Sequence, residues 1–388
     1  MKEDVKKILL VAGEHSGDLL GGDLLKYLKK EIPNLSFEGI GGDEMLKEGL
    51  HSITDIESMN VVGLSGIVSK YKYLKSLARQ LVEICKKENI RYAILIDYPG
   101  FNLRLTKMLR AEGIEVAFFV SPQIWAWRFK RVFFIRDNIS LMLTLFEFEK
   151  DIYLKYGVNA EFVGHPLVQR LEDKLKEYPP LNIEKNKRYI TLMPGSRTTE
   201  IKKHLPILLE TAQKIQEHFS SDTFVFLIPG ISHKNDAFIT ASLKKYKEEN
   251  PNAPEVQYHF DRSPHCISIS ELVILSSGTA TLEVTYFCKP MIIMYKASFF
   301  SYIVASNVKQ VTHIGMVNIL NNDKEVCKEF LQYNATMKKI LPEAIQLLSN
   351  ANYRDQMIQK LKEIKDKLGK GNPSEVAAKA ILKWIRGN

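Results

Sequence analysis

Cysteine is scarce in this chain of 388 residues, and the few that occur lie far apart. The four cysteines are Cys85, Cys266, Cys288 and Cys327, and no two of them form a Cys-x-x-Cys pair. This usage argues against a disulfide framework and against a structural zinc site, and it is typical of a reducing compartment. Asp-x-Asp is also absent, so no obvious carboxylate pair exists to hold a metal-bridged diphosphate. We therefore expect neither a metal site nor a cofactor.

Long apolar runs are missing as well. No run approaches the ~18 residues of a membrane-spanning helix. The apolar run before Gly13 has only five residues, whereas a signal peptide needs roughly 7–15. The sequence thus predicts a cytoplasmic protein that touches a membrane, if at all, only at its surface. The net charge of +9 fits ordinary solubility best, and it also fits an anionic partner such as phosphate, nucleic acid or an acidic membrane. Charge alone does not choose among these.

Short apolar segments alternate with helical patterns along the whole chain, and the length favours two domains. Expected strands cover 8–12, 35–40, 92–96, 115–120, 141–145, 160–163, 189–193, 223–228, 255–259, 272–275 and 291–295. Expected helices include 19–30, 72–88, 102–112, 201–219, 235–248, 353–368 and 374–385. Such alternation indicates βαβ units, and strands rich in Ile, Val, Leu and Phe indicate parallel sheets buried on both faces. The expected fold class is α/β, with two Rossmann-like domains facing a cleft and helices at the C-terminus.

The best domain boundary lies between Val168 and Tyr189, where a Lys/Glu-rich helix is followed by Pro179-Pro180 and a polar segment. We expect a first domain over 1–170, a second over 186–345 and helices over 346–388. The final helices could pack back on the first domain.

The strand at 8–12 runs into a polar loop, Gly13-Glu14-His15-Ser16-Gly17-Asp18. Its glycine spacing matches neither Gly-x-Gly-x-x-Gly nor a P-loop, which disfavours NAD binding and ATP hydrolysis. Ser16 or Asp18 is the expected cap of the following helix. A ligand-binding role and a pure capping role both remain open for this loop.

Two later turns offer more specific chemistry for an anion. Gly195 allows close approach to the backbone, Ser196 can donate a hydrogen bond, and Arg197 is a permanent cation, all before a helix N-terminus. This combination suits a diphosphate that no metal neutralises, although a surface turn whose arginine forms an ion pair would look the same. The turn with Gly278 and Thr279 also opens a helix. Four residues after Thr279, Glu283 could accept hydrogen bonds from a ribose diol, or it could be an exposed helical glutamate.

Asp97 follows the apolar run Ala93-Ile94-Leu95-Ile96 and should lie at the carboxyl edge of the first sheet. Burial there would raise its pKa, which suits a general base. The alternative is an N-cap for a helix that begins near Asn102.

Two segments are unusually apolar for loops, namely 59–68 and 121–134. In the second segment, aromatic residues alternate with cations. They could meet an anionic lipid surface, stack on nucleobases, or simply pack in the core. The candidate lipid-contacting residues are Val61, Val62, Leu64, Ile67, Val68, Trp125 and Trp127.

Taken together, these loops resemble the lipid-A-disaccharide synthases, which are inverting glycosyltransferases of the GT-B type. The similarity runs through nearly the whole chain, and its most specific part is Ser121-Pro122-Gln123-Ile124-Trp125-Ala126-Trp127. Other matching motifs are Gly13–Asp18, Gly39–Gly42, Ile96–Asn102, Val163–Val168, Pro194–Ile201, Ser277–Glu283 and Val317–Leu320. The chain departs from the family at His15, Gly66, Gly100 and Val317.

The resemblance implies transfer of 2,3-diacylglucosamine from UDP to the 6-hydroxyl of 2,3-diacylglucosamine 1-phosphate, without a metal. The product would be a β-1,6-linked disaccharide, made by a protein peripheral to the inner face of the inner membrane. The protein would have no nucleic-acid partner and could form a homodimer that exchanges C-terminal helices.

The resemblance also implies roles for particular residues. Asp97 matches the base, and the donor nucleotide would lie near Ser196, Arg197, Gly278, Thr279, Glu283 and Asn318. The acceptor would lie under Glu14, Ser16, Gly17, Asp18, Gly41 and Gly42.

Two other functions remain to be weighed. A UDP-N-acetylglucosamine 2-epimerase would use the same two-domain plan. Such an enzyme needs no lipid surface, so Trp125, Trp127 and the apolar 59–68 segment argue against it. A non-enzymatic membrane- or RNA-binding protein would use the basic aromatic segment, and its RNA binding would depend steeply on salt.

Overall fold

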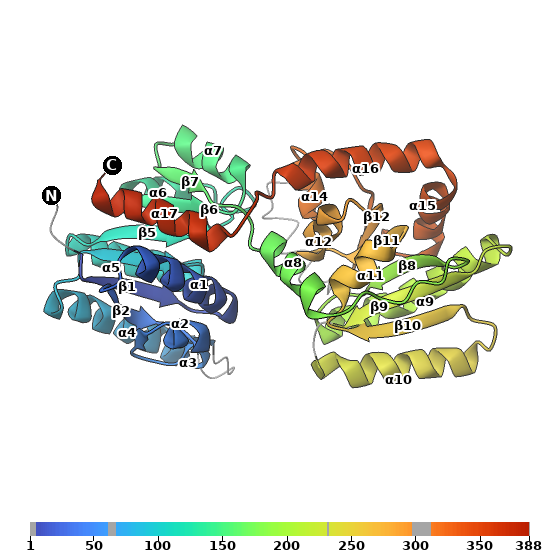
Figure 1. The fold of residues 1–388 in the computed structure, drawn as a ribbon, viewed down its shortest axis with the longest axis horizontal. Coiled ribbons are helices and arrows are strands. Elements are labelled where there is room, and N and C mark those ends of the chain that lie inside the picture. The colour runs from blue at the N-terminus through green and yellow to red at the C-terminus, as the bar shows by residue number, and fades with distance from the viewer. Residues whose placement is uncertain (1–4, 61–66, 231–232, 297–311, 388) are drawn as a thin grey trace. The chain divides into compact units, whose positions relative to one another are not determined.

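The chain forms two compact units, each built on one parallel β-sheet (Figure 1). Unit 1 is Met1–Pro166 together with Leu368–Asn388, and unit 2 is Leu167–Lys367. The structure is a computed structural model, and it describes residues 5–60, 67–230, 233–296 and 312–387. All the strand pairs in both sheets are parallel, which confirms the expected α/β class.

The sheet of unit 1 has the strand order β3-β2-β1-β4-β5-β6-β7. Its strands are β1 (Lys7–Ala12), β2 (Ser36–Ile40), β3 (Leu50–Ser52), β4 (Tyr92–Ile96), β5 (Glu115–Phe119), β6 (Leu141–Thr144) and β7 (Ala160–Phe162). Its helices are α1 (His15–Glu31), α2 (Asp43–Lys47), α3 (Ile56–Asn60), α4 (Ile67–Lys87), α5 (Pro99–Ala111), α6 (Arg131–Asn138), α7 (Glu147–Lys155) and α17 (Pro373–Arg386).

Strand β1 shows how the sequence builds this sheet. Leu9 and Val11 pack with the core that contains helices α4 and α5, whereas Ile8, Leu10 and Ala12 pack with the core that contains α1 and α17. Successive side chains of a strand point to opposite faces, so a continuous apolar run is buried on both sides. A polar residue immediately after such a run therefore lies at the edge of the sheet, where ligands can reach it.

The sheet of unit 2 has the order β10-β9-β8-β11-β12-β13. Its strands are β8 (Arg188–Met193), β9 (Phe224–Gly230), β10 (Glu255–Phe260), β11 (Leu272–Ser276), β12 (Met291–Tyr295) and β13 (Glu329–Leu331). Its helices are α8 (Leu167–Glu177), α9 (Thr198–His218), α10 (His233–Glu249), α11 (Ser263–Ile269), α12 (Ala280–Tyr286), α14 (Met316–Leu320), α15 (Met337–Ser349) and α16 (Ala351–Asp366).

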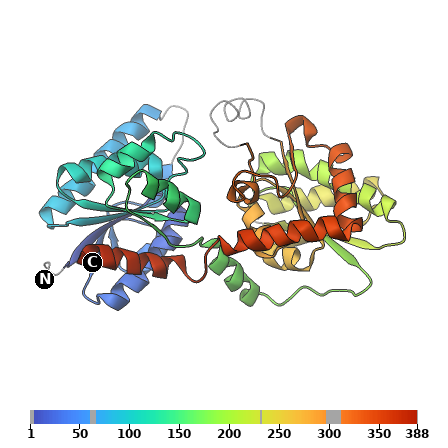
Figure 2. The same ribbon diagram turned by 90° about the horizontal axis from the view of Figure 1, so that it is seen from above.

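The C-terminal helices divide between the two units. Helix α16 packs on α12 and α15 in unit 2, whereas α17 packs on α1 in unit 1 (Figures 1 and 2). Ser374 donates to the Leu20 carbonyl over 3.2 Å, and Trp384 meets Tyr92 edge-on with ring centroids 5.2 Å apart. Residues 346–388 are therefore not one structural part, because α17 buries its apolar stripe on the first sheet.

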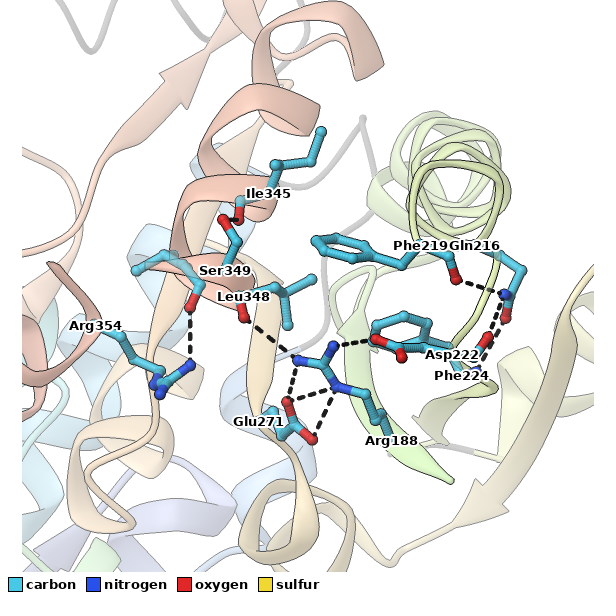
Figure 3. A network of polar contacts seen from close by, with 11 residues as sticks. Arg188, Gln216, Phe219, Asp222, Phe224, Glu271, Ile345, Leu348, Ser349 and Arg354 are labelled. Atoms are coloured by element: carbon cyan, nitrogen blue, oxygen red, sulfur yellow. Dashed lines mark hydrogen bonds and ion pairs between the residues drawn. The ribbon is translucent and has the colours of Figure 1, made fainter. Parts of the chain in front are cut away.

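At the amino edge of the second sheet, Arg188 joins the starts of three neighbouring strands (Figure 3). Its guanidinium pairs with Asp222 at 2.5 Å and with Glu271 at 2.7 Å, and it lies over the rings of Phe219 and Phe224. It also donates to the Leu348 carbonyl at the end of α15 over 3.4 Å. Arg188 is thus a structural arginine, fully engaged in holding β8, β9 and β11 together.

Each sheet has one point where the strand order reverses, between β1 and β4 in unit 1 and between β8 and β11 in unit 2. Ligands of open α/β sheets bind outside the carboxyl ends of the strands at such a switch point. The loops after β1 and β4, and those after β8 and β11, are the ones whose sequences predict function. No helix in the described part of the chain is both long enough and apolar enough to cross a bilayer.

Candidate functional site

Asp97 lies at the switch point of unit 1, in a strained turn between β4 and α5. Asp97 and Tyr98 both have positive φ angles, +49° and +48°, in the left-handed region that non-glycine residues rarely adopt. Each such residue costs about 1–3 kcal/mol and persists only where its surroundings enforce it. Helix α5 starts at Pro99 with Tyr98 at its N-cap position, so the alternative assignment of Asp97 as the N-cap is wrong.

Neighbouring groups enforce this turn. The side-chain amide of Asn102, which is fully buried, donates to the carbonyls of Ile96 and Asp97 over 3.2 and 2.7 Å. The Tyr98 ring fills the space beside Gly13, where an added Cβ would lie 2.4 Å from the ring. Any side chain at position 13 would therefore displace Tyr98. The loop after β1 and the loop after β4 thus pack directly against each other.

The Asp97 carboxyl is half-buried, and its pKa is raised above its ordinary value by opposing effects whose balance is upward. Burial raises its pKa, the backbone N–H of Tyr98 lowers it, and the negative charge of Glu14 raises it. Among the described residues, no side chain pairs with this carboxylate by a hydrogen bond or an ion pair. A carboxylate with a raised pKa and no cation beside it is suited to accept a proton.

The polar residues of the loop 13–18 have two different environments. Glu14 and Ser16 are exposed, and α1 begins at His15 with no side-chain cap, so the prediction that Ser16 or Asp18 caps this helix is wrong. Asp18 is buried instead and accepts the backbone N–H groups of Gly42, Glu44 and Met45 over 2.8, 3.1 and 3.1 Å. Its carboxylate fixes the start of α2, because those N–H groups have no partner within the helix.

The three predicted glycines of this region are packing residues. A Cβ at Gly17 would lie 3.3 Å from that of Ala12, which lets α1 approach β1 closely. A Cβ at Gly41 would lie 2.6 Å from Leu50, and one at Gly42 would lie 2.7 Å from the Asp18 carboxylate. Asp18, Gly17, Gly41 and Gly42 thus shape the loops, whereas Glu14 and Ser16 face solvent.

The two tryptophans of the 121–134 segment have opposite environments. Trp125 is only 8% exposed, and its indole N–H donates to buried Glu149 over 2.9 Å, so its expected place on a lipid-contacting surface is wrong. Ser121 donates to the same carboxylate over 2.9 Å, and burial raises the pKa of Glu149 to about 7. Trp127 is 41% exposed.

Two cations flank the exposed tryptophan. The guanidinium carbons of Arg128 and Arg131 lie 4.7 and 5.2 Å from the centre of the Trp127 ring. Of the other predicted lipid-contacting residues, Val61, Val62 and Leu64 lie outside the described residues. Ile67 and Val68 begin α4, and their side chains are likewise outside the description.

The turn after β8 presents an exposed cation over a buried carboxylate. Gly195 has φ +112°, and a Cβ there would lie 2.7 Å from the Glu200 carboxylate. Arg197 is the N-cap residue of α9, and its Nη1 donates to Glu200 over 2.8 Å while the side chain stays 76% exposed. A guanidinium has five N–H donors, so this ion pair orients Arg197 and leaves other donors for an anion. Glu200, which sequence reasoning had not identified, also accepts from Tyr295 over 3.3 Å.

Ser196 is exposed, and its backbone is anchored from α10. The amide of buried Asn235 donates to the Ser196 carbonyl over 2.9 Å and accepts from Thr198 over 2.6 Å. The turn after β11 lies beside it in the sheet order, with Gly278 (φ +146°) and Thr279 both exposed. Ser277 ties this turn to the next loop by donating to the Ile314 carbonyl over 3.0 Å.

Glu283 lies in the first turn of α12 and is half-buried rather than fully exposed. Its carboxylate accepts from Ser263 over 2.6 Å. Burial raises its pKa, whereas Ser263 and the charges of Arg170 and Lys174 lower it. It therefore has one oxygen committed to Ser263 and keeps further acceptor capacity.

Asn318 is fully buried, and both ends of its side-chain amide are committed within unit 2. The amide N–H₂ group donates to the Cys327 carbonyl and to Glu329, and its oxygen accepts from the N–H groups of Val326 and Cys327. Glu329 in turn accepts the N–H groups of Ile314 and Gly315, both over 2.9 Å. Any part that Asn318 plays in nucleotide binding runs through the loop it holds, since its own polar groups are occupied.

The structure thus gathers the predicted residues at two places. Glu14 and Asp97 lie at the unit 1 switch point. The turns of Ser196–Arg197 and Gly278–Thr279 adjoin at the unit 2 switch point. No group of three His, Cys, Asp or Glu side chains within the described ranges could hold a metal ion.

Two α/β units, each a parallel sheet with small-residue turns at its switch point, have the GT-B fold, which glycosyltransferases and UDP-sugar epimerases share. S. aureus MnaA, solved with UDP, superposes with a TM-score of 0.62 at 14% identity, over 98% of this chain and 97% of that chain. A UDP-GlcNAc 2-epimerase from Neisseria meningitidis, bound to UDP-GlcNAc, gives 0.56 at 12% identity, over 98% and 100%. At these identities the likeness shows the fold alone.

Sequence comparison gives the family. The model of the lipid-A-disaccharide synthetase family matches residues 8–382. Lipid-A-disaccharide synthase 1 of Legionella pneumophila (strain Lens) is 35% identical over 369 residues, which is 94% of each chain. The chain therefore belongs to the lipid-A-disaccharide synthetase family, and the resemblance carried by its motifs is confirmed. It is a glycosyltransferase of lipid A biosynthesis.

Proposed function

We propose that the chain transfers 2,3-diacylglucosamine from its UDP derivative to 2,3-diacylglucosamine 1-phosphate, forming the β-1,6-linked lipid A disaccharide 1-phosphate and UDP. Membership of the family over residues 8–382 is the observation that carries the reaction. The geometry of the two switch points supports particular roles for Asp97, Arg197 and Glu283.

In this proposal Asp97 is the general base. The oxygen of the acceptor 6-hydroxyl attacks the anomeric carbon of the donor, and the hydroxyl proton passes to the Asp97 carboxylate. The bond from the anomeric carbon to the diphosphate oxygen breaks on the opposite side, so the configuration inverts and UDP leaves with the electron pair. The raised pKa of Asp97 supports the assignment, because a base works best when its pKa approaches the working pH.

The donor nucleotide binds unit 2 at the turns after β8 and β11. The exposed guanidinium of Arg197 and the N-terminus of α9 would neutralise the charge that develops on the leaving diphosphate, so the proposal uses no metal. Glu283 could accept from the ribose with the acceptor capacity that Ser263 leaves.

We further propose that the enzyme works as a peripheral protein on the cytoplasmic face of an anionic inner membrane. Trp127, with Arg128 and Arg131 over its ring, supports such contact, because an exposed amphipathic ring beside cations suits the headgroup region. A homodimer that exchanges its C-terminal helices stays a prediction. In the single chain described by the structure, α17 packs on unit 1 of that same chain.

The test is to incubate the protein with UDP-2,3-diacylglucosamine and 2,3-diacylglucosamine 1-phosphate in detergent and to measure UDP and disaccharide. We expect the two products in equal amounts, with activity that survives a chelator. UDP-N-acetylglucosamine supplied alone should not be epimerised at C2. Failure to release UDP in any detergent, or epimerisation without transfer, would contradict the proposal.

A further inference from the structure

His204 is a fully buried histidine in α9 whose two ring nitrogens both have backbone partners. Nδ1 lies 2.8 Å from the Pro194 carbonyl oxygen, at the start of the turn that carries Arg197. Nε2 lies 2.9 Å from the backbone nitrogen of Lys296, directly after β12. One side chain therefore ties the exit of β8 to the exit of β12.

These partners determine the state of the ring. A carbonyl oxygen can only accept, so Nδ1 must carry a proton, and a backbone N–H can only donate, so Nε2 must present its lone pair. The imidazole is therefore neutral and is held in a single tautomer. Protonation at Nε2 would set an N–H against the Lys296 N–H and break the connection to β12.

The same ring is part of the framework that orients Arg197. Its centroid lies 5.7 Å from that of Tyr295, whose hydroxyl donates to Glu200 over 3.3 Å. Glu200 accepts from the Arg197 guanidinium over 2.8 Å. His204 and Glu200 thus hold the two ends of the 194–197 turn, one through a carbonyl and the other through the guanidinium.

We propose that His204 is a positioning residue for nucleotide diphosphate binding, which holds the Pro194–Arg197 turn in its binding geometry only while its ring is neutral. The inference rests on the proposed function, since it takes the ligand of this turn to be the diphosphate of UDP. His204 does not touch the ligand and acts through the turn.

The charged and titratable groups around the ring set the direction of its pH response. Glu200 and Lys203 lie on the same helix, Arg197 on the turn, and Tyr295 and Lys296 at the end of β12. Burial lowers the pKa of His204, the Pro194 carbonyl and Glu200 raise it, and Lys203 lowers it. Because the neutral ring is the working form, UDP affinity is present above this lowered pKa and is lost as the pH falls through it.

The experiment is calorimetric titration of the full-length protein with UDP from pH 5 to pH 8, for the wild type, His204→Gln, His204→Leu and His218→Gln. Glutamine keeps one donor and one acceptor, whereas leucine keeps neither. The exposed His218, at the end of the same helix, controls for the chemical change. The titration of the UDP phosphate is common to all four proteins, so it cancels from their comparison.

We expect His204→Leu to raise the dissociation constant of UDP about tenfold at pH 8, because two hydrogen bonds that shape the turn are lost. His204→Gln should stay within about threefold of the wild type at pH 8. At acid pH it should lack the extra weakening that the wild type and His218→Gln share.

Equal pH profiles for the wild type and His204→Gln would overturn the inference, as would wild-type affinity in His204→Leu. If His204→Leu fails to fold, the comparison of wild type with His204→Gln still decides. Nitrogen chemical shifts that show a proton on Nε2 of His204 at pH 8 would also overturn it. UDP that does not bind the wild type at any pH contradicts the proposed function, and this inference with it.

Discussion

The switch points of the two units have the same topology and opposite chemistry. At that of unit 1, the chain places the carboxylates of Glu14 and Asp97 at the ends of adjacent strands. At that of unit 2, it places an exposed arginine, glycine turns and the start of a long helix. A negative site suits removal of a proton, and a positive one suits a diphosphate. The carboxyl edge of the sheet thus serves a different purpose in each unit, according to which residues follow the strands.

Each unit also contains a second charged residue of the same type, and that residue stabilises the fold. Asp18 has the same side chain as Asp97, but three backbone N–H groups occupy its carboxylate. Arg188 has the same side chain as Arg197, but two carboxylates, a carbonyl and two rings surround it at the other edge of the sheet. In each unit, one residue of the pair stabilises the fold and the other is available for chemistry.

The largest effect should come from Asp97→Asn, which removes the proposed base while keeping its shape. We expect kcat to fall by about 10²–10⁴, with the dissociation constant of UDP unchanged. Near-native kcat in a folded variant would contradict the assignment of the base.

The same variant should not lose stability. The pKa of Asp97 is raised in the folded chain, so its contribution to stability is greatest below the unfolded pKa and is lost as the pH rises through the folded pKa. At neutral pH the buried charge is a cost that asparagine does not carry, and asparagine tolerates a left-handed backbone well. Urea unfolding should therefore show equal or higher stability for Asp97→Asn.

Arg197→Met should weaken UDP binding about 10–100-fold, because hydrogen bonds to charged groups contribute roughly 1.5–3 kcal/mol each. Its melting temperature should fall only slightly, since the arginine side chain is mostly exposed and Glu200 keeps the hydroxyl of Tyr295 as a partner. The matched control is Arg188→Met, which should show the reverse, a lower melting temperature with unchanged UDP affinity. If both variants lost UDP affinity equally, the contrast between the two arginines would fail.

Asp18→Asn should cost about 1–3 kcal/mol of unfolding free energy, because an amide N–H₂ replaces an oxygen that accepts backbone N–H groups. Denaturant unfolding, compared with Asp97→Asn, measures the difference between an aspartate that holds the fold and one that does not. Equal stabilities for the two variants would contradict the structural role of Asp18.

The smallest effect should come from Glu14→Gln. Removing its charge lowers the pKa of Asp97, because Glu14 raises that pKa. The acid limb of the profile of kcat/KM against pH should then move to lower pH, while activity at neutral pH changes little. A limb that moves to higher pH, or does not move, would show that Glu14 does not act on the base.

Local sequence pattern predicted much of this arrangement. The apolar run before Asp97 placed it at a sheet edge, and the Gly-Ser-Arg order placed Arg197 before a helix, because both patterns depend on near neighbours. The burial of Trp125 could not be predicted in the same way, since Trp125 lies in a turn and its partner Glu149 lies on α7, 24 residues further along the chain. Asp18 and His204 were missed in their real roles for the same reason. Their partners at 42–45 and at 296 are remote in sequence and are brought close only by the fold.

The most direct test of the division between the two switch points is hydrogen exchange of the backbone amides with and without UDP. We predict the strongest protection in unit 2, at the turns 194–197 and 277–279 and in the loop around Gly315, with no comparable protection at residues 13–18 or 97–102. Protection concentrated at 13–18 and 97–102, with none at 194–197, would contradict the account.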